Sequence, residues 1–190
     1  MTEKEEITKE FQLVRMDEIK ISSLDNPIIG TEGLGPCISF ILHNKENKKA
    51  IVGHLSTDMF LNEESMLNIV LKIYNLVKEN NMKNTYFDLY LIEGAMRSIQ
   101  EIYLYNYDII KSNNTSAHSS LEVLEILIKN IKCIKINNII RDNKENVQIV
   151  DFNGNVIDNS NSESFIRYVF DSRNGEFVTN KVFGSGKTRR

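Results

Sequence analysis

Two apolar runs joined by a polar turn constrain the fold of this chain most strongly. Residues 38–44 read ISFILHN, residues 50–56 read AIVGHLS, and the polar sequence NKENKK connects them. Short apolar runs bounded by a turn predict a β-hairpin whose strands are buried on at least one face. Antiparallel pairing would place residues 50–56 opposite residues 36–43, so the end of the second strand should return beside the start of the first.

The remaining patterns predict two helices and several further strands. Asn62 can cap a helix over 63–80, where apolar residues recur at helical spacing. A second helix is expected at about 119–130, and residues 30–37, with three glycines and a proline, are expected to form a loop. Strands are predicted at 11–16, 19–22, 85–93, 131–136, 147–152, 164–171 and 176–183, with a hairpin turn at Asn174-Gly175. Because helices separate runs of antiparallel strands, the pattern predicts an α+β fold.

The chain of 190 residues is long enough for one domain with a sizeable core. We expect a single catalytic domain over 11–183, preceded by a flexible charged arm at 1–10. Residues 96–112 fit either a helix or irregular structure. The sequence GSGKT at 184–188 is similar to the end of a phosphate-binding loop, but that pattern needs a glycine at position 181, which is Lys181. We therefore expect residues 184–190 to be a disordered tail or a non-native remnant.

Composition and charge limit the classes of partner to expect and the cellular compartment in which the protein works. The formal net charge of −3 gives no basic footprint, so no nucleic-acid partner is expected. No apolar run approaches the length of a membrane helix, so no membrane insertion is expected. The first ten residues lack the apolar core of a Sec signal peptide, and two cysteines favour a reducing compartment. The expected location is the cytoplasm, or a host cell reached by a specialised secretion route.

Cys37 and His54 are the candidate chemical pair. A catalytic thiol needs a histidine that removes its proton, and a third group that holds the imidazole in the useful tautomer. Gly33 and Gly35 free the backbone ahead of Cys37, where N–H groups could stabilise an oxyanion. Pro36 has no N–H, so the donor at the nucleophile must be the N–H of Cys37 or of a neighbour. The predicted hairpin would bring His54 beside Cys37.

A structural interpretation competes with this one. A cysteine before an apolar strand is usually a small buried hydrophobe, and a histidine on a strand is usually structural. Cys133 alternates with isoleucines and is expected to be structural, whereas His43 and His118 are expected at the surface. The two cysteines and three histidines are too scattered for a zinc signature, and no cofactor is expected.

The sequence T-E-G-L-G-P-C, followed by Gly53-His54, resembles a known family. Thr31 lies six residues before Cys37, and His54 lies seventeen residues after it. These spacings resemble those of the chemoreceptor glutamine deamidase family CheD, in its T-x-x-L-G-x-C context. The arrangement is also similar to that of the cytotoxic necrotizing factor and Burkholderia lethal factor group of deamidating toxins. The stretches 94–96 and 167–178 resemble the glycine-rich turn and the closing hairpin of CheD.

The resemblance implies a mixed β-sandwich flanked by helices, in an α/β/β/α arrangement. It also implies a protein-glutamine deamidase in which Cys37 attacks the glutamine carboxamide and His54 transfers the proton to the departing ammonia. Thr31 would orient His54. The implied partner is a protein carrying the target glutamine, either a chemoreceptor or a host protein.

Three further residues are candidates for substrate or oxyanion contacts. Gly35 and Pro36 precede the cysteine, and Ser56 follows the histidine. Two alternatives stay open for the whole site. One is another thiol acyl-transfer enzyme, such as a transglutaminase or a peptidase, and the other is a non-catalytic binding protein of the same fold.

Overall fold

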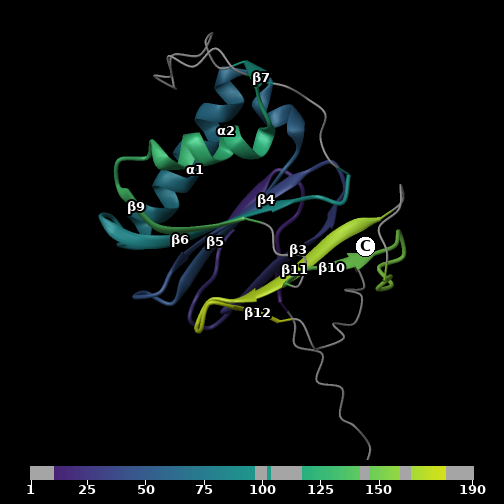
Figure 1. Cartoon of the computed structure of the whole chain (residues 1–190). Coiled ribbons are helices and arrows are strands. Elements are labelled where there is room, and N and C mark those ends of the chain that lie inside the picture. Colours follow the sequence, from purple (N-terminus) through teal and green to yellow (C-terminus); the bar gives the residue numbers. More distant parts are fainter. Residues whose placement is uncertain (1–10, 97–101, 104–116, 142–145, 159–163, 179–190) are drawn as a thin grey trace, which may run out of the picture.

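The computed structural model describes residues 11–96, 102–103, 117–141, 146–158 and 164–178 (Figure 1). These residues form two main β-sheets and two α-helices, which confirms the α+β class. The arm at 1–10, the tail at 184–190 and most of 96–112 lie outside the described residues.

Each main sheet has five strands. Sheet A has the order β1 (Gln12–Leu13), β3 (Ile28–Leu34), β11 (Phe165–Asp171) and β10 (Gln148–Val150), with β12 (Glu176–Phe177) also paired to β11. Sheet B has the order β2 (Glu18–Ile21), β5 (Lys49–Leu55), β4 (Ile38–Asn44), β6 (Thr85–Glu93) and β9 (Ile134–Arg141). The two parallel pairs, β1 with β3 and β6 with β9, make both sheets mixed.

The sheets stack face to face, and helices α1 (Glu63–Glu79) and α2 (Ser120–Lys129) cover the outer face of sheet B (Figure 1). A short 3-10 helix, η1 (Thr57–Phe60), precedes α1, and a small hairpin of β7 (Ile102–Tyr103) and β8 (Ala117–His118) precedes α2. One apolar cluster fills the space between helices and sheet B, and a second fills the space between the sheets. Neither helix of the described part is long and apolar enough to cross a membrane.

The predicted hairpin is confirmed as β4 and β5. Their register runs from Ile38 opposite Leu55 to Asn44 opposite Lys49. The ring of Phe40 covers Gly53 from the helix side, where a Cβ on Gly53 would lie only 2.2 Å from the ring. Gly53 is therefore required by the packing of Phe40, one residue before His54.

Both predicted helices are confirmed, as is the predicted Asn62 cap. The side chain of Asn62 accepts a hydrogen bond from the N–H of Ser65 at the start of α1. Ser119 and Glu122 form a reciprocal capping box at the start of α2. Polar caps satisfy the exposed N–H groups of the first turn, which explains why the sequence marks these boundaries well.

Two elements differ most from their predicted boundaries. Residues 30–37 are not one loop, because β3 continues to Leu34 between β1 and β11, and Gly33 takes a positive φ of 79° beside a register shift. The strand predicted at 131–136 begins only at Ile134, because Cys133 lies in a turn and its carbonyl accepts from the N–H of Asn84 at 2.8 Å. The predicted hairpin at Asn174-Gly175 is confirmed by the pairing of β11 with β12.

The surface position predicted for His43 is wrong. Its side chain faces sheet A, is 1% exposed, and lies with its ring 5.2 Å from that of Phe170. The His43 Nε2 atom is 2.9 Å from the carbonyl oxygen of Ser172. His118 is also partly buried. His43 is buried because it continues the inward-facing alternation of Ile41, a position that the polar turn nearby had concealed.

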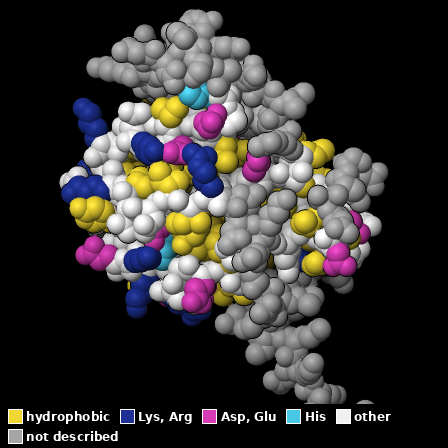
Figure 2. All heavy atoms as spheres, in the orientation of Figure 1, with side chains coloured by type: hydrophobic (Ala, Val, Ile, Leu, Met, Phe, Trp, Pro, Cys, Tyr) yellow, Lys and Arg dark blue, Asp and Glu magenta, His cyan; other side chains and the backbone are white. Residues whose placement is uncertain are grey.

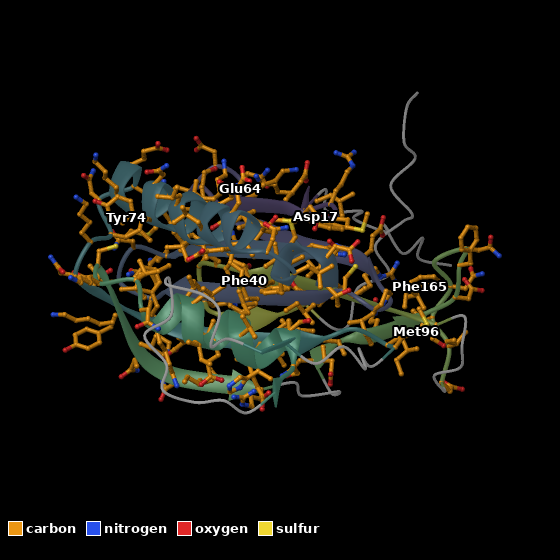
Figure 3. The ribbon with its side chains drawn as sticks, turned by 90° about the horizontal axis from the view of Figure 1, so that it is seen from above. Asp17, Phe40, Glu64, Tyr74, Met96 and Phe165 are labelled. Carbon is orange, nitrogen blue, oxygen red and sulfur yellow. The ribbon has the colours of Figure 1, made fainter. Side chains whose placement is uncertain are left out.

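The sandwich has two distinct ends. In the view from above, Met96 and Phe165 lie at one end, Tyr74 lies at the other, and Phe40 lies between them (Figure 3). Cys37 lies directly before β4, at the Met96 end. The N–H of Gly94 donates to the Cys37 carbonyl there, and the N–H of Met96 donates to the Gly35 carbonyl. At the opposite end, several Lys or Arg side chains (dark blue) lie along the left edge of the molecule (Figure 2).

Candidate functional site

The candidate site lies between the two sheets. Thr31 projects from β3 of sheet A, and His54 projects from β5 of sheet B. The Thr31 Oγ1 atom lies 2.8 Å from the His54 Nδ1 atom, and both side chains are buried. The structure therefore brings together two of the three residues that the sequence predicts, across a contact that joins separate sheets.

The hydrogen bonds around Thr31 define the tautomer of His54. The Thr31 hydroxyl donates to the carbonyl oxygen of Val14 at 2.6 Å, which uses its single proton. Thr31 must then accept from His54, so the imidazole carries its proton on Nδ1. The Nε2 atom is left with a free lone pair, and it has no hydrogen-bond partner among the residues that the structure describes. A histidine in this tautomer is ready to act as a base through Nε2.

Cys37 lies on the same inner face as His54. Ser39 is directly opposite His54 in the β4–β5 pair, and Cys37 is two residues before Ser39. Such diagonal neighbours have Cα atoms about 7–8 Å apart, within reach of two side chains. Because Nε2 is unpartnered, the thiol and the imidazole do not hydrogen-bond in this structure, as is common in catalytic pairs before substrate binds.

The segment after β6 clamps the cysteine turn. The N–H of Gly94 donates to the carbonyl of Cys37 at 3.1 Å, and the N–H of Met96 donates to that of Gly35 at 3.0 Å. Gly94 is close to the turn, because a Cβ there would lie 2.1 Å from the Gly35 carbonyl oxygen. Among the described residues, the Cys37 N–H donates no hydrogen bond to another residue. That N–H is available as an oxyanion donor beside the thiol.

A second polar contact between the sheets was missed by the sequence reasoning. Ser39 Oγ donates to the carbonyl of Gly53 at 2.5 Å and lies 2.6 Å from the hydroxyl of Tyr168. Since the Ser39 proton is used, Tyr168 donates to Ser39, and burial raises the pKa of the Tyr168 phenol. The available signal was a serine within the apolar run 38–44, two residues after Cys37. This contact fixes the spacing of the sheets beside the site.

Asp17 is a further residue that the sequence did not indicate. Its N–H donates to the carbonyl of His54 at 2.6 Å, and its carboxylate accepts from the N–H of Ser56 at 2.8 Å. It adopts a positive φ of 61°, which aspartate tolerates in turns. Asp17 therefore ties the end of β5 to the turn before β2.

The electrostatics favour a neutral thiol and a neutral imidazole at rest. Burial raises the pKa of the Cys37 thiol, and the carboxylates of Asp17 and Asp58 raise it further. Burial also lowers the pKa of His54, although Asp17 and the Val14 carbonyl offset part of this effect. A preformed thiolate–imidazolium pair is thus disfavoured, and proton transfer to His54 would accompany attack by the thiol.

The three predicted contact residues occupy different positions. Gly35 is buried and its N–H already donates to the carbonyl of Gly33 at 3.0 Å, so that N–H is engaged. Pro36 is exposed at the tip of the turn. Ser56 is half-buried at the end of β5, where its N–H is held by Asp17. Pro36 and the Ser56 hydroxyl stay candidates for substrate contact.

A cavity of about 270 Å³ adjoins the cysteine turn on the outer face of sheet A. Phe165 lines it and also packs toward the turn, 3.4 Å from where a Cβ of Gly35 would lie. Phe152, which is 86% exposed, and Glu32 line it as well. Across the described ranges, no group of three histidine, cysteine or acidic side chains is arranged to hold a metal ion.

Acidification is expected to weaken the fold through His43 and His54. Burial holds the pKa of both below the ordinary 6.5, so the unfolded chain takes up protons first as the pH falls through 6.5. The free energy of unfolding should fall by up to about 1.4 kcal/mol per pH unit for each histidine, and level off below the folded-state pKa. Urea unfolding across this range, compared with His43→Gln and His54→Gln, measures the effect. An unchanged pH slope in both variants would contradict it.

Comparison with known proteins leaves the family open. No family model matches the chain. Over 93 residues, 49% of the chain, the sequence is 29% identical to an uncharacterized protein of Rickettsia conorii. The matched region is 51% of that protein, so the chain spans about half the length of the curated relative that it matches.

Proposed function

We propose that this protein is a cysteine-dependent deamidase that converts a glutamine side chain of another protein to glutamate. The observation that supports it most is the hydrogen-bonded series from Val14 through Thr31 to His54, which leaves His54 Nε2 unprotonated on the face that carries Cys37. These are the residues and spacings that resemble the CheD and toxin deamidases. The α/β/β/α arrangement of that group belongs to the proposal, and the described residues supply one helix layer and two sheets.

The proposed reaction follows from the groups present. Cys37 Sγ attacks the carboxamide carbon while His54 Nε2 takes the thiol proton, and the Cys37 N–H stabilises the oxyanion. His54 then protonates the nitrogen, ammonia departs, and a thioester remains. Water, activated by the same imidazole, hydrolyses the thioester to glutamate and restores the thiol. Thr31 holds the imidazole ring in one orientation throughout.

A catalytically idle binding protein is the second candidate, and one observation favours it. Cys37 is 5% exposed and its pKa is raised, as expected for a structural thiol. A deamidase would need substrate to reach Sγ past the exposed Pro36. The two candidates differ in whether Cys37 forms an acyl intermediate.

The test is a search for deamidation that depends on Cys37. Candidate target proteins, chemoreceptors and host signalling proteins among them, are incubated with wild type and with Cys37→Ser, and their peptides are mapped by mass. The expected result is a gain of about one dalton at a glutamine with the wild type alone. A transglutaminase would instead attach an added primary amine to that glutamine. Equal, slow alkylation of Cys37 and Cys133, with no mass change in any target, would contradict catalysis.

A further inference from the structure

The end of sheet B opposite the cysteine carries a concentrated set of lysines. β4 ends where β5 begins, β6 runs antiparallel to β4, and β9 runs parallel to β6. The turns that enter β5, β6 and β9 therefore meet at one end of the sheet. Residues 44–49, 78–88 and 130–138 form these turns and the helix and strand ends beside them. Their exposed lysines, which we call the lysine rim, are Lys45, Lys48, Lys78, Lys83, Lys132 and Lys135.

The charge at this end differs from that of the whole chain. With half-buried Lys49, residues 44–49, 78–88 and 130–138 hold seven lysines against three carboxylates, those of Glu46, Glu79 and Asp88, which leaves four positive charges on the sheet B side of this end. The chain as a whole carries −3. Asp88 is buried and paired with Lys45 at 2.7 Å. Several dark blue Lys or Arg side chains lie along the left edge of the space-filling view, at this end of the molecule (Figure 2).

An exposed aromatic side chain lies within the lysine rim. Tyr86 is 63% exposed, and the ammonium of Lys135 lies 5.4 Å from its ring centroid. Tyrosine rings are enriched where a membrane meets water, because the ring is apolar and the hydroxyl is polar. Lysine ammonium groups on flexible stems suit a diffuse anionic surface, and clusters of four to eight such charges are typical of binding to anionic lipids.

We propose that the lysine rim binds the anionic surface of a lipid membrane. Binding to a nucleic acid or an acidic protein would favour arginine, whose planar group pairs with phosphate or carboxylate in two parallel bonds. Residues 44–49, 78–88 and 130–138, which form the sheet B side of this end, contain no arginine.

The sheet A half of the same end has the opposite charge. Asp25 and Glu176 are exposed there, and Arg173 is paired with Asp171 at 2.6 Å. The protein would therefore approach the membrane with its sheet B side. The seven-residue strand β4 separates the rim from Cys37 by roughly 20 Å. The candidate site would face away from the lipid.

The experiment is sedimentation of the full chain with phosphatidylcholine vesicles, with and without phosphatidylserine. The expected result is binding only with phosphatidylserine, reversed by high salt. Each lysine near the surface should contribute about fivefold to the partition coefficient, so Lys83→Gln with Lys132→Gln should weaken it by more than about tenfold. Lys72→Gln with Arg15→Gln removes the same charge away from the rim and should have little effect.

Several outcomes would overturn the proposal. These are no binding to either vesicle, equal binding to both, or an equal loss in the two double variants. A duplex DNA or poly-glutamate that binds at the same salt while the vesicles do not would point to another class of partner. Circular dichroism of both double variants checks that the fold is intact. Vesicle binding is measured without catalysis, so its result does not depend on whether the protein is a deamidase.

Discussion

Replacing His54 by alanine is expected to lower the rate of glutamine deamidation by about 10²–10⁴-fold, because one residue supplies both the base and the acid. His54 Nε2 has no hydrogen-bond partner among the described residues and lies on the inner face that carries Cys37, close to the start of β4, whereas His43 lies at the other end of that strand. The rate is measured by ammonia release and by peptide mass on an identified target. The rate of Cys37 alkylation should fall as well, since the general base is removed.

Two further variants separate catalysis from folding. His54→Gln keeps a polar side chain of similar reach that can donate to Thr31, but it cannot accept and return a proton, so it should be as inactive as alanine. Thr31→Val removes the hydroxyl and should cost less, because the Val14 carbonyl near Nδ1 can still orient the ring. Substantial Cys37-dependent activity in both His54 variants would show that a different group is the base.

The acidic limb of the pH profile should reflect the same histidine. Burial holds the pKa of His54 below its ordinary 6.5, so the base form persists below that pH and activity should be lost only at lower pH. A limb centred above 6.5 would contradict the burial seen here.

Elements with local signals were predictable from the sequence. The β4–β5 hairpin and helix α1 follow from periodicity, a polar turn and an Asn62 cap, all of which lie within a few residues of each other. β3 was missed because its glycines favour a loop locally, whereas pairing on both sides with β1 and β11 holds it extended. Tertiary pairing here outweighs local preference.

The contacts of the candidate site likewise divide into local ones, which the sequence predicted, and long-range ones, which it did not. The hairpin register, which is local, placed His54 beside the strand that follows Cys37. The contact between Thr31 and His54 joins two sheets, and only the family resemblance suggested it. Ser39 was marked locally as a serine within an apolar run, but its contact with Tyr168 and the contact of Asp17 with Ser56 join residues distant in sequence, so no spacing could have revealed these partners.

Replacing Gly94 by alanine is expected to disrupt the cysteine turn. The new Cβ would lie 2.1 Å from the carbonyl oxygen of Gly35 and 2.5 Å from that of Cys37. Both are backbone atoms, so no side chain can move aside, and the turn or the end of β6 must shift. Overpacking of this kind typically costs about 1–3 kcal/mol in the free energy of unfolding. The same shift would move Cys37 relative to His54, so deamidation should fall by more than the loss of folded protein explains.

Gly154→Ala provides the matched control. Gly154 has a positive φ of 82° with open space around it, so alanine there adds backbone strain without a steric clash. Urea unfolding and deamidation are measured for both variants at a temperature where each is folded. We expect Gly154→Ala to lose stability and keep most of its activity, whereas Gly94→Ala loses both. If folded Gly94→Ala deamidates its target at the wild-type rate, the clamp on the turn does not position Cys37, and its role is limited to joining β6 to the sandwich.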